Sequence, residues 1–240
     1  MPGMRLDKFL RDQGVASRSD IREYVKKGLV QVNNSVVRDP GFHIDPEKDS
    51  VVFDGRTIKY NKYVYFMLNK PKGVITATFD TRGITVLDLF PENIRRRNVF
   101  PVGRLDKDTE GLLFITDDGI FAHNLLAPKK RVEKLYEAKL DKLPSEDAVR
   151  IFSEGVVLDD GYRTMPAALE LISSQNEIIA RVKIYEGKYH QVKRMFRAVG
   201  ANVISLKRLS MGGISLDESL RPGEYRELTK EEITILESNF

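Results

Sequence analysis

The order of strand-like and helix-like segments in this chain departs from the regular βαβ alternation of a parallel sheet. Strand-like apolar runs lie at 63–68, 112–115, 132–140, 167–172 and 178–185. Helical patterns lie at 85–90, 118–127, 144–153, 190–199 and 231–237, the third with Pro144 near its start and the last capped by Thr229. Because parallel strands need regular helical crossovers, this order favours an α+β fold with a mainly antiparallel mixed sheet flanked by helices.

The N-terminal part of the chain predicts a small module of its own. Apolar residues recur at helical spacing from Leu6 to Leu10, and a second helical pattern follows Ser17 or Ser19. Two short apolar runs flank the turn 33–35, and another strand is expected at 51–53. We therefore expect one domain over residues 1–60, with a linker from about residue 55, and a second over residues 61–240.

Positive charge is concentrated in one segment of the C-terminal half. The whole chain carries a formal net charge of +4, whereas the segment from Arg181 to Arg208 contains eight basic residues and the single acid Glu186. Such clustering indicates a surface for a polyanion, and a solvated helix face is the alternative interpretation. Charge alone does not choose between the two.

Composition excludes several kinds of chemistry. The chain has no cysteine and three histidines, which excludes disulfides and thiolate catalysis and argues against a histidine-rich metal site. It contains no Walker A loop, no dinucleotide fingerprint and no metal-ligand spacing. No apolar run is long enough to span a bilayer, and no secretory signal is present, so we expect a cytoplasmic protein without a cofactor or a metal.

The segment 103–113, GRLDKDTEGLL, is the most informative stretch of the chain for function. It places Arg104 and Asp106 two residues apart in a predicted loop, directly before the apolar run 112–115. A carboxylate held beside a cation at the edge of a strand is suited to act as an anion.

Several segments together resemble the Rsu type of ribosomal RNA pseudouridine synthases. The matching segments are 65–71 (YFMLNKP), 103–113, 134–137 (KLYE), 186–196 (EGKYHQVKRMF), 212–214 and 222–226. The N-terminal segment, from MRLDKFL to KKGLVQVN, resembles the S-four RNA-binding module, whose basic helices contact RNA phosphates. A generic helix–hairpin domain is the alternative for that module.

The resemblance implies catalytic roles for Asp106, Tyr136 and Lys193. Asp106 matches the catalytic aspartate, acting as a nucleophile or a base, and the sequence leaves both routes open. Tyr136 would stack on uracil and assist proton removal at C5. Lys193, at the edge of the apolar stripe of the 190–199 helix, would hold Asp106 ionised by lowering its pKa. Asp108 and His190 are not assigned catalytic roles.

The remaining candidate residues are basic side chains expected to contact RNA. Arg104 matches an arginine that helps extrude the target base in related enzymes. The candidates for phosphate contacts are Lys70, Lys72, Arg194, Arg197, Arg5, Lys8, Arg18 and Arg22.

Within this resemblance, segments 65–71 and 186–196 are most similar to the small-subunit enzymes. That similarity implies isomerisation of uridine 516 of 16S ribosomal RNA, with ribosomal RNA or a partly assembled small subunit as partner, by a monomer that does not bind membranes. A 23S ribosomal RNA synthase and a non-catalytic ribosome-assembly factor are the alternatives. A methyltransferase is disfavoured because no glycine-rich cofactor loop follows a strand.

Overall fold

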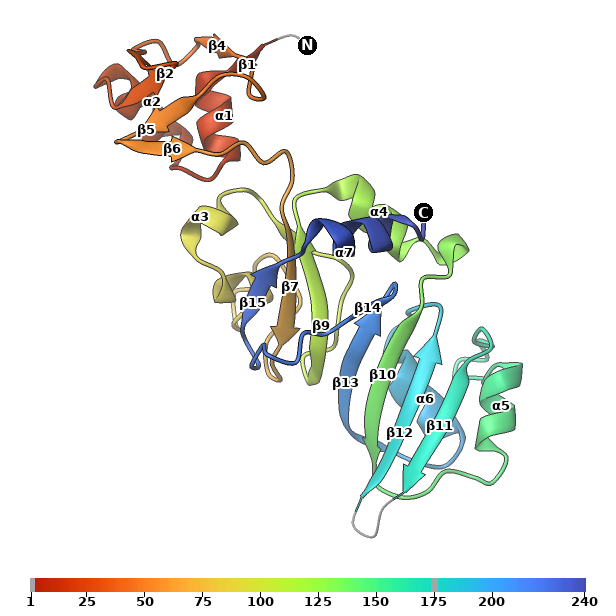
Figure 1. The fold of residues 1–240 in the computed structure, drawn as a ribbon. Coiled ribbons are helices and arrows are strands. Elements are labelled where there is room, and N and C mark those ends of the chain that lie inside the picture. Colours follow the sequence, from red (N-terminus) through yellow and green to blue (C-terminus); the bar gives the residue numbers. More distant parts are fainter. Residues whose placement is uncertain (1–2, 174–176) are drawn as a thin grey trace. The chain divides into compact units, whose positions relative to one another are not determined.

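The computed structural model describes residues 3–173 and 177–240 (Figure 1). These residues form two compact units, one of residues 3–64 with 87–100 and one of residues 65–86 with 101–173 and 177–240. The first unit includes the short helix α3, Glu92–Arg95, and most of the 3-10 turn η1, Val86–Leu89. No helix in the described ranges is long and apolar enough to cross a membrane.

The N-terminal module has the two helices and the hairpin that its sequence predicts. Helix α1 covers Leu6–Asp12 and helix α2 covers Arg18–Lys26, with the Ser17 hydroxyl accepting a hydrogen bond from the backbone N–H of Asp20. The short strands form a four-stranded sheet ordered β3-β2-β5-β6 and a pair β1-β4. Their bounds are β1 Met4–Arg5, β2 Val30–Val32, β3 Ser35–Val36, β4 His43–Ile44, β5 Val51–Phe53 and β6 Arg56–Ile58.

A small apolar core and one tight turn fix this module. The core buries Leu6, Phe9 and Ile21, among others, at the face where both helices meet the sheet. Asn33 and Asn34, between β2 and β3, have φ values of 50° and 65°, which is the backbone that a two-residue hairpin turn requires. Asparagine tolerates this conformation better than most residues, so the turn is encoded locally.

The larger unit is built on a mixed sheet whose main path is β11-β12-β10-β13-β9-β7-β15 (Figure 1). Strand β14 pairs with β13, and β8 pairs with β9. The strands are β7 Tyr65–Lys70, β8 Phe100–Pro101, β9 Thr109–Thr116, β10 Lys134–Leu140, β11 Ala168–Ser173, β12 Ile178–Ile184, β13 Val203–Met211, β14 Ile214–Ser215 and β15 Tyr225–Glu227. The fold is therefore the α+β arrangement that the order of segments predicts.

The pairing of β9 with β13 is parallel, whereas the other paired strands along this path run antiparallel. Three residue pairs make this junction, from Leu206 opposite Thr109 to Arg208 opposite Gly111. Gly111 has a φ of 99°, and a Cβ there would lie 2.3 Å from the carbonyl oxygen of Arg208. Only glycine lets the two backbones approach this closely. We call the three paired positions the β9–β13 junction.

Helices cover both ends of this sheet. Helices α5, Ala148–Glu154, and α6, Gln191–Ala198, pack through Phe152 and Phe196, whose ring centroids are 5.2 Å apart. At the other end, α4, Gly119–Leu126, is capped by Asp118, whose carboxylate also accepts a hydrogen bond from the Tyr65 hydroxyl. The 3-10 turn η2, Pro128–Lys130, follows α4.

The structure differs from the sequence prediction at several places. The short strands β8, β14 and β15 were not predicted, and the helix expected at 85–90 is the 3-10 turn η1. Helix α5 begins at Ala148, so Pro144 lies before it instead of near its first turn. Strand β13 was not predicted, although it is nine residues long and central to the sheet. Its sequence, VISLKRLSM, mixes apolar, basic and hydroxyl residues, and burial along it does not follow residue type: Ile204 is exposed, whereas Arg208 is buried.

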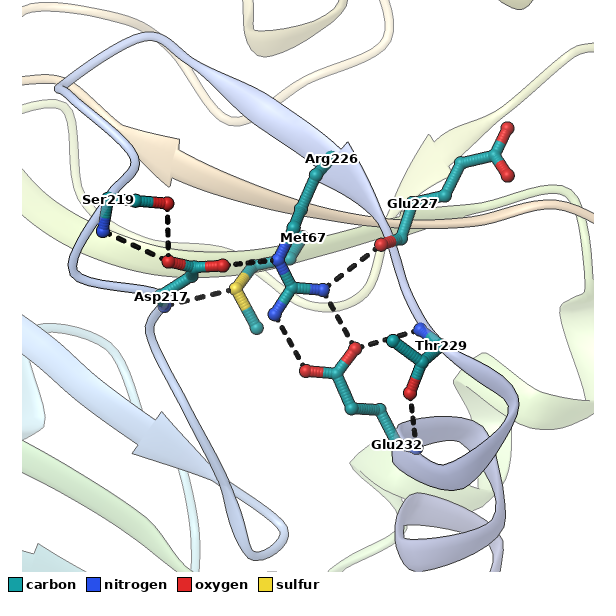
Figure 2. Close-up of polar contacts among 7 residues, drawn as sticks. All are labelled: Met67, Asp217, Ser219, Arg226, Glu227, Thr229 and Glu232. Atoms are coloured by element: carbon teal, nitrogen blue, oxygen red, sulfur yellow. Dashed lines mark hydrogen bonds and ion pairs between the residues drawn. The ribbon is translucent and has the colours of Figure 1, made fainter.

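A polar network centred on Arg226 connects β15 to the last helix, α7, which covers Lys230–Glu237 (Figure 2). The Arg226 guanidinium donates to Glu232 at 2.7 and 2.8 Å and to Asp217 at 2.6 Å. Glu232 also completes a capping box with Thr229. Hydrogen bonds from Ser219 and Arg226 lower the pKa of Asp217 to about 2, so its contribution to stability persists at acidic pH and is lost only as pH falls toward that value.

We expect Arg226→Met to lower the free energy of unfolding by about 2 kcal/mol, because it leaves Asp217 and Glu232 without their shared donor. Urea denaturation measures the change. The matched control is Arg150→Met, since Arg150 pairs with Asp147 and Glu154 on an exposed helix face. That variant should lose less than about 0.5 kcal/mol. Equal losses in the two variants would contradict a special role for the Arg226 network.

We expect Gly111→Ala to destabilise the protein by about 3 kcal/mol or more, through backbone strain together with overlap at Arg208. Gly223→Ala is the control, because Gly223 has a φ of 93° and no atom within 4 Å of a Cβ placed there. The control variant has the backbone strain without the overlap, so it should lower the free energy of unfolding by about 1–2 kcal/mol. If the two variants had the same urea midpoint, the close approach of the backbones at the junction would contribute nothing beyond the strain.

Candidate active site

Asp106 lies in the loop between β8 and β9, and neighbouring backbone bonds fix that loop. The Leu105 carbonyl accepts a 2.8 Å hydrogen bond from the Thr76 hydroxyl, and Leu105 itself is buried. The backbone N–H of Gly73 donates to the Lys107 carbonyl at 2.7 Å. Because both neighbours of Asp106 are fixed in this way, its side chain projects from a defined position.

Lys70 supports the same loop from inside the protein, which corrects its predicted role. Its side chain is fully buried, and Nζ donates to the carbonyls of Pro71, Lys107 and Thr109 at 3.0, 3.3 and 2.9 Å. Burial lowers the pKa of Lys70 to about 8. A buried lysine cannot reach RNA phosphates, so the prediction of a phosphate contact by Lys70 is wrong. Lys72 is exposed.

Lys193 on α6 forms ion pairs with two carboxylates of this loop. Its Nζ lies 3.0 Å from Asp106 Oδ2 and 2.6 Å from Asp108 Oδ1. Burial alone would lower the pKa of Lys193, but hydrogen bonds to Asp108 and Asp106 outweigh it and the pKa is raised. The hydrogen bond from Lys193 to Asp108 also lowers the pKa of Asp108. The structure thus brings Lys193 to Asp106, as the sequence predicts, and adds Asp108 as a second partner.

Tyr136 lies on β10, opposite Arg208 of β13, and its side chain is buried. With Asp106 it lines a pocket of about 80 Å³. The other lining residues are Arg104, Leu105, Thr109, Ile184, Gly187, Lys188, His190, Gln191, Val192 and Leu206. A carboxylate and a phenol ring therefore share one small cavity, with an apolar floor from Ile184 and Leu206.

His190 is a site residue to which the sequence assigned no catalytic role. Its Nε2 lies 3.5 Å from Asp106 Oδ1, and it precedes α6 with a φ of 50°. A left-handed backbone is uncommon outside glycine and asparagine, and it concentrates at functional sites. The sequence signal that could have identified His190 is its position three residues before Lys193 in the same motif.

Arg194 forms ion pairs with Asp159 and with Asp160, the latter at 2.7 Å. Its contact with an RNA phosphate stays a prediction. Arg104 and Arg197 are exposed, and Arg104 lines the pocket beside Asp106.

In the N-terminal module, several predicted RNA contacts form a charged cluster around the buried carboxylate of Asp7. Arg5 binds Asp7 at 2.9 Å, and Arg22 lies 4.0 Å from it. Hydrogen bonding from Arg5 lowers the pKa of Asp7. Lys8 and Arg18 line a hollow next to this pair. Their contacts with RNA stay predictions.

Two sequence profiles match the chain. That of the RNA pseudouridylate synthases covers residues 64–198, and that of the S4 domain covers residues 4–50. More than half of the chain therefore matches one family of enzymes.

Relatives and a solved structure agree with these profiles over nearly the whole length. An uncharacterised RNA pseudouridine synthase of Bacillus subtilis is 46% identical over 97% of this chain and 98% of its own. The ribosomal small subunit pseudouridine synthase A of Escherichia coli is 42% identical, with coverage of 96% and 98%. The ribosomal large subunit pseudouridine synthase B of Bacillus subtilis is 40% identical, with coverage of 95% and 93%.

A crystal structure of a pseudouridylate synthase is 35% identical and superposes with a TM-score of 0.67, with coverage of 97% of this chain and 99% of that one. The chain belongs to the RNA pseudouridylate synthase family and carries an N-terminal S4 domain. Within the family, its relatives include ribosomal small subunit pseudouridine synthases at 42% identity.

Proposed function

We propose that this protein isomerises a uridine of ribosomal RNA to pseudouridine, with Asp106, Tyr136 and Lys193 as its catalytic residues. The observation that carries the proposal is the shared pocket of Asp106 and Tyr136, with Lys193 paired to Asp106 at 3.0 Å. The proposed enzyme acts as a monomer in the cytoplasm, and the reaction calls on no metal and no cofactor.

The proposed reaction breaks the glycosidic bond between N1 and ribose, rotates uracil and forms a C–C bond at C5. C5 loses a proton and N1 gains one, so substrate and product are isomers. Asp106 acts as the nucleophile toward ribose or as the base toward the ring. Lys193 keeps positive charge next to this carboxylate, and Tyr136 stacks on uracil and assists removal of the C5 proton. Arg104 at the pocket rim braces the extruded base, since a base inside a stacked helix cannot reach a cavity of this size.

We propose uridine 516 of 16S ribosomal RNA as the target, as free RNA or in a partly assembled small subunit. The similarity to the Escherichia coli small-subunit enzyme over 96% of this chain supports this choice. The segment Tyr189 to Arg194, YHQVKR, favours it as well. A 23S target is the alternative, because a large-subunit synthase is 40% identical.

We expect Asp106→Asn to lower pseudouridine formation by on the order of a thousandfold or more, because an amide neither attacks as a nucleophile nor accepts the proton. Its affinity for RNA should stay within a few fold. Pseudouridine mapping of unmodified 16S and 23S RNA, incubated with wild type and variant, measures the result. One new pseudouridine in 16S RNA, made only by wild type, supports the proposal. A new pseudouridine in 23S RNA instead supports the alternative target.

Asp108→Asn is the matched control, because Asp108 also pairs with Lys193 but is more exposed. It should lose less than about tenfold in rate, as expected for an exposed ion pair. If Asp108→Asn lowered the rate as much as Asp106→Asn, Asp106 could not be assigned as the catalytic carboxylate in preference to Asp108. Tight RNA binding without any new pseudouridine would favour the non-catalytic assembly factor.

We further propose that residues 1–60 form the RNA anchor and residues 61–240 the catalytic domain. The S4 profile over residues 4–50 and the exposed basic side chains of α1 and α2 support the anchor. Shape and phosphate recognition by such a surface needs no base-specific contact.

We expect the double variant Arg18→Gln/Arg22→Gln to bind 16S RNA more weakly, with a salt slope that is smaller by about 0.7 to 0.9 for each lost phosphate contact. Lys48→Gln is the control, since Lys48 is an exposed cation of the same module outside both helices. Filter binding across a salt series gives the slopes. An unchanged slope in the double variant would remove these helices from the RNA contact.

A further inference from the structure

Two aromatic rings stack on each other at the mouth of the candidate active site. The ring centroids of Tyr189 and His190 are 3.8 Å apart, with an interplanar angle of 20°. The Tyr189 side chain is 72% exposed, although a tyrosine ring loses favourable burial when it stands in water. The positive φ of His190 holds its ring beside Asp106, so the stacked pair has a fixed place relative to the catalytic carboxylate.

His190 separates two hollows that lie next to each other. It lines the pocket of about 80 Å³ that contains Asp106 and Tyr136. It also lines a second hollow of about 440 Å³, together with Asp159, Asp160, Tyr189, Lys193, Arg194 and Arg197. No other residue lines both hollows. A nucleotide whose base enters the first hollow can therefore place its covalent neighbour at the second.

The second hollow has the chemistry of a nucleotide site. Tyr189 offers an exposed ring face on which a base can stack. Arg197 is exposed and makes no ion pair with another described residue, so its guanidinium is free for a phosphate. Arg194 neutralises Asp159 and Asp160 through its ion pairs, which reduces their repulsion of a polyanion.

We infer that the second hollow binds the nucleotide adjacent to the target uridine, with its base stacked on Tyr189 and its phosphate beside Arg197. This inference rests on the proposed function, because it presupposes an RNA substrate in the first pocket. Stacking tolerates any base, since every base presents a π face. The site therefore fixes the backbone around the target uridine and holds the flipped base in register with Asp106.

The test uses 2-aminopurine, a base whose fluorescence falls when it stacks on an aromatic ring. The probe is a single-stranded RNA oligomer with the sequence around uridine 516 of 16S RNA, with 2-aminopurine on the 5′ or the 3′ side of the uridine. The full-length wild type and Tyr189→Phe should quench the probe at one of the two positions. Tyr189→Leu should abolish the quenching and weaken affinity by roughly tenfold.

Phe79→Leu is the control, because Phe79 is as exposed as Tyr189, at 77% against 72%, and lines neither hollow. It should match wild type in quenching and affinity. Equal quenching by wild type and Tyr189→Leu, or no quenching by wild type at either position, would overturn the inference.

Turnover separates this inference from the proposed function. On 16S RNA, Tyr189→Leu should raise KM by roughly tenfold and change kcat less, because stacking contributes to binding more than to bond breaking. If wild type quenches the probe but forms no pseudouridine in ribosomal RNA, the stacking site is supported and the proposed reaction is refuted. A loss confined to kcat, with quenching intact, refutes the stacking site alone.

Discussion

The β9–β13 junction is the contact on which the candidate active site depends. Asp106 lies in the loop that leads into β9, whereas Tyr136 belongs to β10, on the other side of β13, and Lys193 belongs to α6. Only three residue pairs hold these two halves of the sheet in register. Their spacing is set where Gly111 allows its backbone to lie against that of Arg208. The distances among these three candidate side chains therefore depend on a backbone contact that none of them makes.

Buried positive charge reinforces the same region. Lys70, Lys134 and Arg208 are nearly or fully buried, and each donates to backbone carbonyls: Lys70 in the Asp106 loop, Lys134 to Val132 and Arg208 to Leu112. Burial, and then the charge of Arg208, lowers the pKa of Lys134 to about 8. Burying cations costs free energy that a purely apolar core would not require. Of these cations, Lys70 lies close enough to Asp106 for the two charges to interact.

The sequence predicted the parts of the structure that local patterns encode. The hairpin at Asn33, the cap at Thr229 and the Asp106 loop before an apolar strand each follow from a few adjacent residues. Strand β13 escaped prediction because its main partners, β9 and β10, are distant in the chain and its residues do not alternate cleanly. The resemblance placed Lys193 near Asp106, but it could not show that Asp108 shares the lysine or that Lys70 points inward. Those facts depend on tertiary packing.

The location of the site across the β9–β13 junction has a consequence for how the protein becomes active during folding. Contacts between Asp106 and Lys193 span 87 residues of chain, so closing this loop is entropically slow compared with forming the hairpins on either side. A chain in which each half of the sheet has formed separately already has most of its secondary structure, but its candidate catalytic side chains are still apart. Enzymatic activity thus reports on a long-range pairing, while circular dichroism reports mainly on local structure.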